Sequence, residues 1–161
     1  MPDYTLGKGK VYWKADVGGT GIDVHLGNCP EFNFSPSLDK IEHFSSKSGA
    51  ALKDDELITT KKVTVKFKLD EPNVSNMARF VMGGIAGDVI NAFTLTEQKG
   101  HLHFVGDPPK GVTWDFKAYG NLIPDGDLAL IGSDWMEFGF TFEVLDSDVY
   151  AGMFSMEDIS A

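Results

Sequence analysis

Two histidines at alternate positions are the side chains best placed in this sequence for metal chemistry. His101 and His103 lie two residues apart in a segment with strand-like composition, so both rings would point to one face and could share a metal ion. No third ligand stands nearby at a suitable spacing, because Cys29 is distant in the sequence and no spaced carboxylate completes a set. We therefore interpret them as ordinary strand histidines and predict that the protein needs no metal or other cofactor.

The remaining motifs that could do chemistry are incomplete. Asp125-Gly126-Asp127 resembles a fragment of a calcium loop but lacks the further oxygen ligands and the terminal glutamate, so a β-turn is the better interpretation. His43 follows Glu42 without a nucleophile at a useful spacing. The sequence contains no GxSxG, P-loop or HExxH motif. These observations predict that the protein is not an enzyme.

Charge is the strongest deviation in the composition. The chain has 24 acidic and 14 basic residues and a net charge of -10, whereas its 42% hydrophobic and 24% charged residues are typical of a globular protein. Affinity for nucleic acid comes from lysine and arginine contacts to phosphates, and Arg79 is the only arginine. The composition thus excludes disorder and argues against a protein that binds nucleic acid.

Cysteine usage and hydropathy indicate where the protein folds. Cys29 is the only cysteine, so no intrachain disulfide can form and a reducing cytoplasm is the simple expectation. The first ten residues lack the pattern of a cleaved signal peptide, and no apolar run approaches the length needed to span a membrane. We expect a soluble protein that has no membrane partner and is not exported by a signal peptide.

Period-2 alternation of apolar and polar residues dominates the chain and predicts strands. It is clearest in residues 63–69, 112–118 and 136–144. Shorter predicted strands cover residues 10–15, 22–26, 32–35, 89–96 and 102–105. One segment breaks the pattern: Asn73 is a suitable N-cap for a helix of about ten residues that ends near Gly83.

These elements predict a mainly β fold, a β-sandwich or partly open barrel with one short flanking α-helix and a long protruding hairpin loop. The sequence shows no internal repeat or linker, so residues 1–161 are expected to form a single domain. Residues 146–161 are acidic and less periodic, which leaves open whether they form a mobile or a docking tail.

The hairpin loop is expected between residues 45 and 56, where composition is polar and no periodicity is present. Hairpin loops normally take two to five residues, so one of about a dozen residues usually has a function. We interpret this loop as a subunit interface, mobile in the free monomer and ordered in a polymer. Its residues are Ser45, Ser46, Lys47, Ser48, Gly49, Ala50, Ala51, Leu52, Lys53, Asp54, Asp55 and Glu56.

Four segments also resemble a known family. GKVYW near the start, LGNCPEF, IEHFSSKSG and KDDELITTKKVTV are similar to the tail tube (major tail) proteins of long-tailed bacteriophages. The resemblance implies a virion protein, assembled in the bacterial cytoplasm, whose hexameric rings stack into a tube around a tape-measure protein. It implies tail terminator and tip proteins as further partners, passage of DNA without specific binding, and a hairpin that reaches onto the neighbouring subunit.

The polar face of the strand predicted over residues 59–69 is relevant to which residues would line the tube interior. Lys62, Lys66 and Lys68 lie opposite the apolar face of that predicted strand. In a monomer this pattern marks a solvent-facing sheet, and in a ring it could join across subunits into a closed barrel. Since the interiors of tubes in this family are net acidic, the lysines should face outward or be offset by carboxylates. Asp39 and Glu42 are the predicted lumen-facing residues.

Two alternatives remain open from the sequence. A carbohydrate-binding β-sandwich or adhesin module would use Trp13, Trp114 and Trp135, although the register of Trp114 favours a core position. A secretion-system tube protein of the haemolysin-coregulated type would share the ring architecture. The sequence does not distinguish contractile from non-contractile tails.

Overall fold

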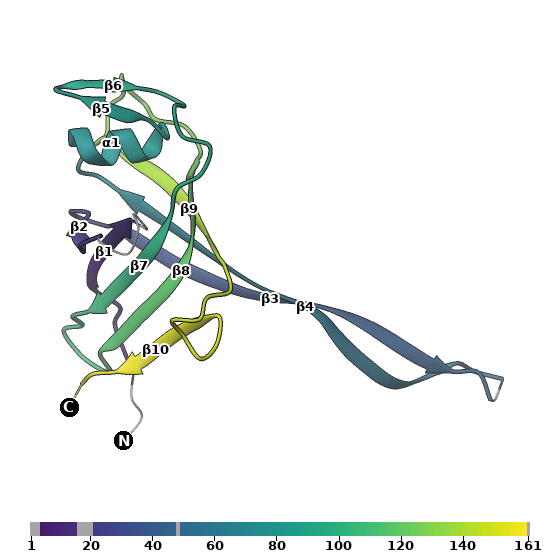
Figure 1. Ribbon diagram of the computed structural model, residues 1–161. Coiled ribbons are helices and arrows are strands. Elements are labelled where there is room, and N and C mark those ends of the chain that lie inside the picture. The colour runs from purple at the N-terminus through teal and green to yellow at the C-terminus, as the bar shows by residue number, and fades with distance from the viewer. Residues whose placement is uncertain (1–3, 16–20, 48, 161) are drawn as a thin grey trace.

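The computed structural model describes residues 4–15, 21–47 and 49–160 (Figure 1). These residues contain ten strands and one helix. In chain order they are β1 (Gly9–Ala15), β2 (Val24–His25), β3 (Glu31–Ser45), β4 (Leu52–Leu69), α1 (Val74–Phe80), β5 (Gly84–Ala86), β6 (Val89–Asn91), β7 (Lys99–Gly106), β8 (Trp114–Asp125), β9 (Phe138–Val144) and β10 (Phe154–Asp158).

Most of the strands form one antiparallel sheet. Its order is β2-β1-β7-β8-β9-β4-β3, and β10 also pairs with β8. Two strands pair with the same edge of β8. Strand β10 pairs with the first half of β8, and β9 pairs with its second half. Strands β5 and β6 form a separate two-stranded sheet beside α1 (Figure 1).

The main sheet curls over itself without closing. Phe32 on β3 stacks on Phe104 on β7, with 5.0 Å between ring centroids, although three strands separate β3 from β7 in the sheet order. Trp13 on β1 meets Phe142 on β9 edge-on at 6.0 Å. These contacts across the concave face make the fold a partly open barrel, and the predicted fold class, mainly β with one short helix, is confirmed.

Side-chain alternation explains which face is buried. Phe138, Phe140, Phe142 and Val144 of β9 are all buried, and the residues between them are more exposed. Because the side chains of a strand alternate between faces, one face of β9 lines the core and the other faces water. Burial of one phenylalanine contributes about 1.5–3 kcal/mol, so these aromatic strands supply much of the stability.

The helix begins where the sequence predicts but ends earlier. The Asn73 side chain accepts a hydrogen bond from the Asn76 amide at 2.9 Å, which confirms the N-cap. The last helical residue is Phe80, and Met82 rather than Gly83 adopts the left-handed conformation, at a φ of 50°. No helix in the described part of the chain is long and apolar enough to cross a bilayer.

Some local predictions were wrong. Trp114 is exposed rather than buried, since it is the first residue of β8 and pairs with Asp158 at the end of the sheet, beyond the core. The strand predicted over residues 89–96 stops at Asn91, where the chain turns back to α1. In the C-terminal segment, Phe154–Asp158 dock on β8 as β10.

Candidate assembly interface

Strands β3 and β4 continue far beyond the body of the molecule as a two-stranded hairpin (Figure 1). They pair with each other from Glu31 and Lys68 to Ser45 and Leu52. By contrast, β9 pairs with β4 only from Thr64 to Leu69. Every described residue between 33 and 62 is exposed except Ser45, which is half-buried. The outer part of the hairpin, residues 38–58, is called the hairpin arm below.

The prediction of a loop over residues 45–56 was wrong at both ends. Ser45 is the last residue of β3, and Leu52–Glu56 belong to β4, so the described connection comprises residues 46, 47 and 49–51. Ser48 lies outside the described residues. The polar composition of residues 52–56 suggested a loop, but cross-strand charge pairing lets them form a strand. The interface role of residues 45–56 remains a prediction.

Two register shifts divide the hairpin arm. They lie between Asp39 and Lys40 and between His43 and Phe44, and β4 carries the extra residue each time. Such β-bulges increase the local twist. Because β3 itself alternates regularly, Lys40, Glu42 and Phe44 share one face, whereas Asp39, Ile41 and His43 share the other.

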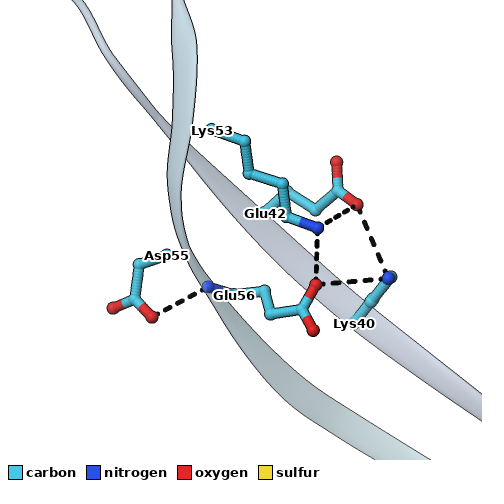
Figure 2. Close-up of polar contacts among 5 residues, drawn as sticks. All are labelled: Lys40, Glu42, Lys53, Asp55 and Glu56. Carbon is cyan, nitrogen blue, oxygen red and sulfur yellow. Dashed lines mark hydrogen bonds and ion pairs between the residues drawn. The ribbon is translucent and has the colours of Figure 1, made fainter.

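A closed group of charges occupies the Lys40 face (Figure 2). Glu42 and Glu56 are direct cross-strand partners, an arrangement that is unfavourable without cations. The Lys53 Nζ lies 3.1 Å from Glu42 and 2.6 Å from Glu56. The Lys40 Nζ lies 3.2 Å from Glu56 and 3.7 Å from Glu42. The four charges therefore cancel and hold the two strands of the arm in register.

Pairing within this charge group stabilises the charged forms, so the pKa of the glutamate is lowered and that of the lysine is raised. Hydrogen bonds from Lys53, followed by Lys40, lower the pKa of Glu56. Hydrogen bonds to Glu56 and Glu42 raise the pKa of Lys53. On the other face, His43 Nδ1 lies 2.5 Å from the Asp54 carboxylate. All these pairs are exposed to solvent, so they specify the geometry of the arm more than they stabilise the fold.

The arm also exposes large apolar side chains. Ile41 and Leu57 are direct cross-strand partners on the His43 face. The full set comprises Leu38, Ile41, Phe44, Leu52, Leu57 and Ile58, all of them exposed. In the pairing register Ile41, Leu52 and Leu57 lie on the His43 face, whereas Leu38, Phe44 and Ile58 lie on the Lys40 face. Each face of the arm therefore exposes three large apolar side chains, and exposed apolar surface of this kind usually marks an interaction site. A protruding strand pair with this composition is suited to lie on another protein surface.

The polar face of β4 is a mixed-charge surface. Lys62, Lys66 and Lys68 are exposed there, as predicted. The Nζ of Lys68 lies 3.6 Å from the Glu31 carboxylate. A hollow of 320 Å³ brings Lys66 and Lys68 together with the carboxylates of Glu31, Asp125, Asp127 and Glu137. Carboxylates from β3, from the end of β8 and from the β8–β9 connection thus lie in the same hollow as two of the three lysines.

The structure does not bring the two predicted lumen residues together. Asp39 and Glu42 lie on opposite faces of the arm, because they are three residues apart on a regular strand. Asp39 shares its face with Lys62, whereas Glu42 is neutralised by Lys40 and Lys53. Their lumen-facing role remains a prediction, and Asp39 is the better candidate.

The paired histidines have carboxylate and phenol partners that the sequence analysis missed. His103 Nε2 lies 2.5 Å from Asp115 and its Nδ1 lies 3.8 Å from Asp23. His101 Nδ1 lies 3.2 Å from the Tyr150 hydroxyl, whose pKa is raised by burial and by the two nearby carboxylates. Within the described ranges, no group of three or more His, Cys, Asp or Glu side chains could hold a metal ion.

The other sequence candidates lie apart from one another. Trp13 is buried in the core, Trp114 lies beside the end of β10, and Trp135 lies in the β8–β9 connection at the opposite end of β8. They do not form one sugar-binding platform. Cys29 packs against the core, and burial raises the pKa of its thiol from 9.0 to about 11.

Comparison with protein families gives one match. The sequence profile of the family described as "Protein of unknown function UCP028589" matches residues 4–106. This range includes the hairpin arm, α1 and all of β7. No curated protein matches the chain.

Two solved structures have a similar fold. A chain from the "Cryo-EM structure of the anti-feeding prophage (AFP) baseplate, 6-fold symmetrised" aligns with a TM-score of 0.58 at 9% identity, covering 100% of this chain and 99% of that one. A chain from the "Tail of empty GTA particle computed with helical refinement, C6 symmetry" aligns with a TM-score of 0.51 at 12% identity, covering 91% and 95%. The likeness is one of fold and extends over nearly the whole chain.

Proposed function

We propose that this chain, which belongs to the family described as Protein of unknown function UCP028589, is a structural subunit of a phage-type tail. It assembles with copies of itself into hexameric rings that stack into the tail tube, the conduit for genome ejection. The fold it shares with chains from two six-fold assemblies supports this proposal.

The observation that carries the proposal is the hairpin arm. It extends away from the body of the molecule (Figure 1), its apolar side chains are exposed in the single chain, and the lysines and glutamates on its Lys40 face are already paired with one another. In a cyclic ring each subunit contacts its neighbour through two different surfaces. An arm that extends to one side supplies one of these surfaces, and the neighbouring subunit receives it.

Truncation of the arm tests the proposal. Asp39 and Thr60 are cross-strand partners, so replacing residues 40–59 by Asn-Gly should close a shorter hairpin with a two-residue turn. The truncated chain should keep the wild-type far-UV spectrum and cooperative melt but sediment as a monomer, whereas the wild type forms rings. Truncated chains that still form rings would refute the arm as the joint.

The proposed role as a conduit for DNA depends on the charge of the inner wall of the tube. With a net charge of -10 per subunit, an inner wall holding its share of carboxylates repels duplex DNA, over a range of about 8–10 Å at physiological salt. Assembled tubes should therefore not bind DNA at low salt, and Asp39→Lys should slow genome ejection. Salt-sensitive DNA binding by wild-type tubes would contradict this role.

A baseplate subunit is the second candidate. The higher TM-score belongs to the chain from the 6-fold symmetrised baseplate. A tube subunit adds rings without limit, whereas a baseplate subunit would stop at a single ring. Electron microscopy of concentrated protein distinguishes the two by the length of the assemblies.

A further inference from the structure

The two ends of the barrel present different surfaces. Strand β8 ends at Asp125 beside Gly139 of β9, and β7 begins at the same end. Residues 83–96 and 126–137 therefore lie together with α1, at what we call the helix end. Residues 4–10 and the β7–β8 connection, residues 107–113, lie at the other end, called the terminal end. Figure 1 shows the helix end at the top, the termini at the bottom and the hairpin arm to one side.

The helix end exposes a second set of large apolar side chains. Trp135 and Ile131 in the β8–β9 connection are 92% and 97% exposed. The set comprises Ile85, Val89, Phe93, Leu95, Leu130, Ile131 and Trp135. Tryptophan and phenylalanine are enriched in protein–protein contacts relative to the rest of the surface. None of these residues belongs to the hairpin arm, so the helix end is a separate candidate contact.

Phe93 is held in its exposed position by the backbone. Its φ is 56°, a left-handed conformation that is unfavourable for a bulky side chain. Its amide donates to the Val81 carbonyl at 2.9 Å, and the Leu95 amide donates to the Met82 carbonyl at 3.0 Å. These bonds fix the segment after β6 against the end of α1. An unfavourable backbone that presents an aromatic ring to solvent is consistent with a binding role.

Charge distinguishes the helix end from the terminal end. Residues 83–96 and 126–137 contain four exposed carboxylates, those of Asp88, Asp127, Asp134 and Glu137, and no Lys, Arg or His. Asp127 and Glu137 share a hollow with Lys66 and Lys68, so the uncompensated charge of these segments comes from Asp88 and Asp134. Two helix ends facing each other would bring these carboxylates against those of the second copy. This like-charge contact disfavours head-to-head association of two copies.

The terminal end carries three exposed lysines. Lys8, Lys10 and Lys110 are exposed there beside a single acidic residue of the same segments, Asp107. The Leu6 amide donates to the Lys110 carbonyl at 3.2 Å, which joins the two segments into one surface. Tyr4 and Leu6 add exposed apolar area. The end of β10, with two carboxylates, borders this surface.

We propose that the helix end is the docking surface for the terminal end of a second copy of this chain, in a head-to-tail stack. The inference deepens the proposed tube function and rests on it, since the arm would join copies within a ring and these two ends would join successive rings. Apolar side chains meet on both sides, and the lysines of one copy face the carboxylates of the next.

Two blocked variants test the proposed contact. Ile131→Ser with Trp135→Ser removes apolar area from the helix end, and Tyr4→Ser with Leu6→Ser removes it from the terminal end. All four side chains are exposed, so both variants should fold and form rings. Stacking of either variant alone should require about tenfold or more higher ring concentration, because large apolar side chains leave the contact. Val149→Ser, an exposed residue outside both ends and the arm, is the control.

The decisive sample is a mixture of the two variants as preformed rings. Head-to-tail docking predicts pairs of rings in the mixture, because each variant keeps one intact end, and isolated rings in either variant alone. Ring pairs formed by the terminal-end variant alone would mean head-to-head contact and overturn the inference. Wild-type-like stacks of either variant alone would show that its altered end is not the contact.

The outcomes separate this inference from the function on which it rests. Wild-type rings that never stack would contradict the stacking inference and leave the ring proposal standing. Wild-type protein that forms no rings would contradict both. Electron microscopy reads out all of these states in one experiment.

Discussion

The cross-strand pair Ile41 and Leu57 gives the most direct test of the arm by point substitution. The two side chains are direct partners on one face of the arm and are 63% and 67% exposed. The double substitution Ile41→Ser with Leu57→Ser removes apolar surface that the proposed neighbour would cover. It leaves the charge group of the opposite face in place.

The size of the effect follows from the exposed fractions. Burying a whole Leu or Ile side chain contributes ~1.5–3 kcal/mol, so covering about two thirds of each gives about 2–4 kcal/mol for the pair. Since about 1.4 kcal/mol is a tenfold change in Kd, each contact between neighbours should weaken by about 30- to 700-fold. The free energy of unfolding of the monomer should change by no more than about 0.5–1 kcal/mol, because the pair lies outside the core.

Sedimentation velocity over a range of concentrations measures the assembly, and denaturant unfolding measures the stability of the monomer. Val149→Ser is the matched control, because Val149 is also 67% exposed but lies outside the arm. It should assemble like the wild type. If the double variant assembles at the wild-type concentration, the arm is not a subunit contact.

Five further predictions concern the fold, its titratable groups and its independence of metal. Phe142→Ala should destabilise the protein by about 3–5 kcal/mol in denaturant unfolding, because the ring is fully buried. Asn76→Ala should cost about 2–4 kcal/mol, because its buried amide bonds the Leu26 carbonyl at 2.8 Å and its oxygen accepts from Arg79; Asn76→Asp should not rescue it. Cys29 should react with iodoacetamide at pH 8 about 100-fold more slowly than a thiol of pKa 9.0, given its pKa of about 11. The lowered pKa of Glu56 means that its pairing with Lys53 is fully present above pH 4.5, the ordinary value, and is lost as pH falls through the lowered pKa, so the side-chain carboxyl NMR signal of Glu56 should titrate below pH 4.5. A chelator should leave the thermal melt unchanged, and a large loss of Tm would contradict the prediction that no metal is required.

Local signals explain what the sequence predicted correctly. The alternation of Phe138, Phe140 and Phe142 is a property of one strand, and the Asn73 cap involves residues within one helical turn. Both can be read without knowledge of distant partners. The three lysines on the exposed face of β4 follow from the same alternation.

Long-range pairing explains what the sequence missed. Leu52–Glu56 form a strand because Lys53 meets Glu42 across the hairpin, a partnership between residues that local composition does not reveal. The extent of the arm and its two bulges depend on the same pairing. The exposed apolar side chains of the helix end were missed for a different reason. Ile131 and Trp135 lie in a connection without periodicity, so the sequence does not indicate whether their side chains are buried, and only the structure shows that they are exposed.

Cryo-electron microscopy of the concentrated wild-type protein tests the central claim most directly. The account predicts six-fold rings in which the arm, residues 38–58, lies on the neighbouring subunit, which covers Ile41 and Leu57. Uniform particles of 17.6 kDa, the mass of a single chain, or rings in which the arm contacts no neighbour, would contradict it.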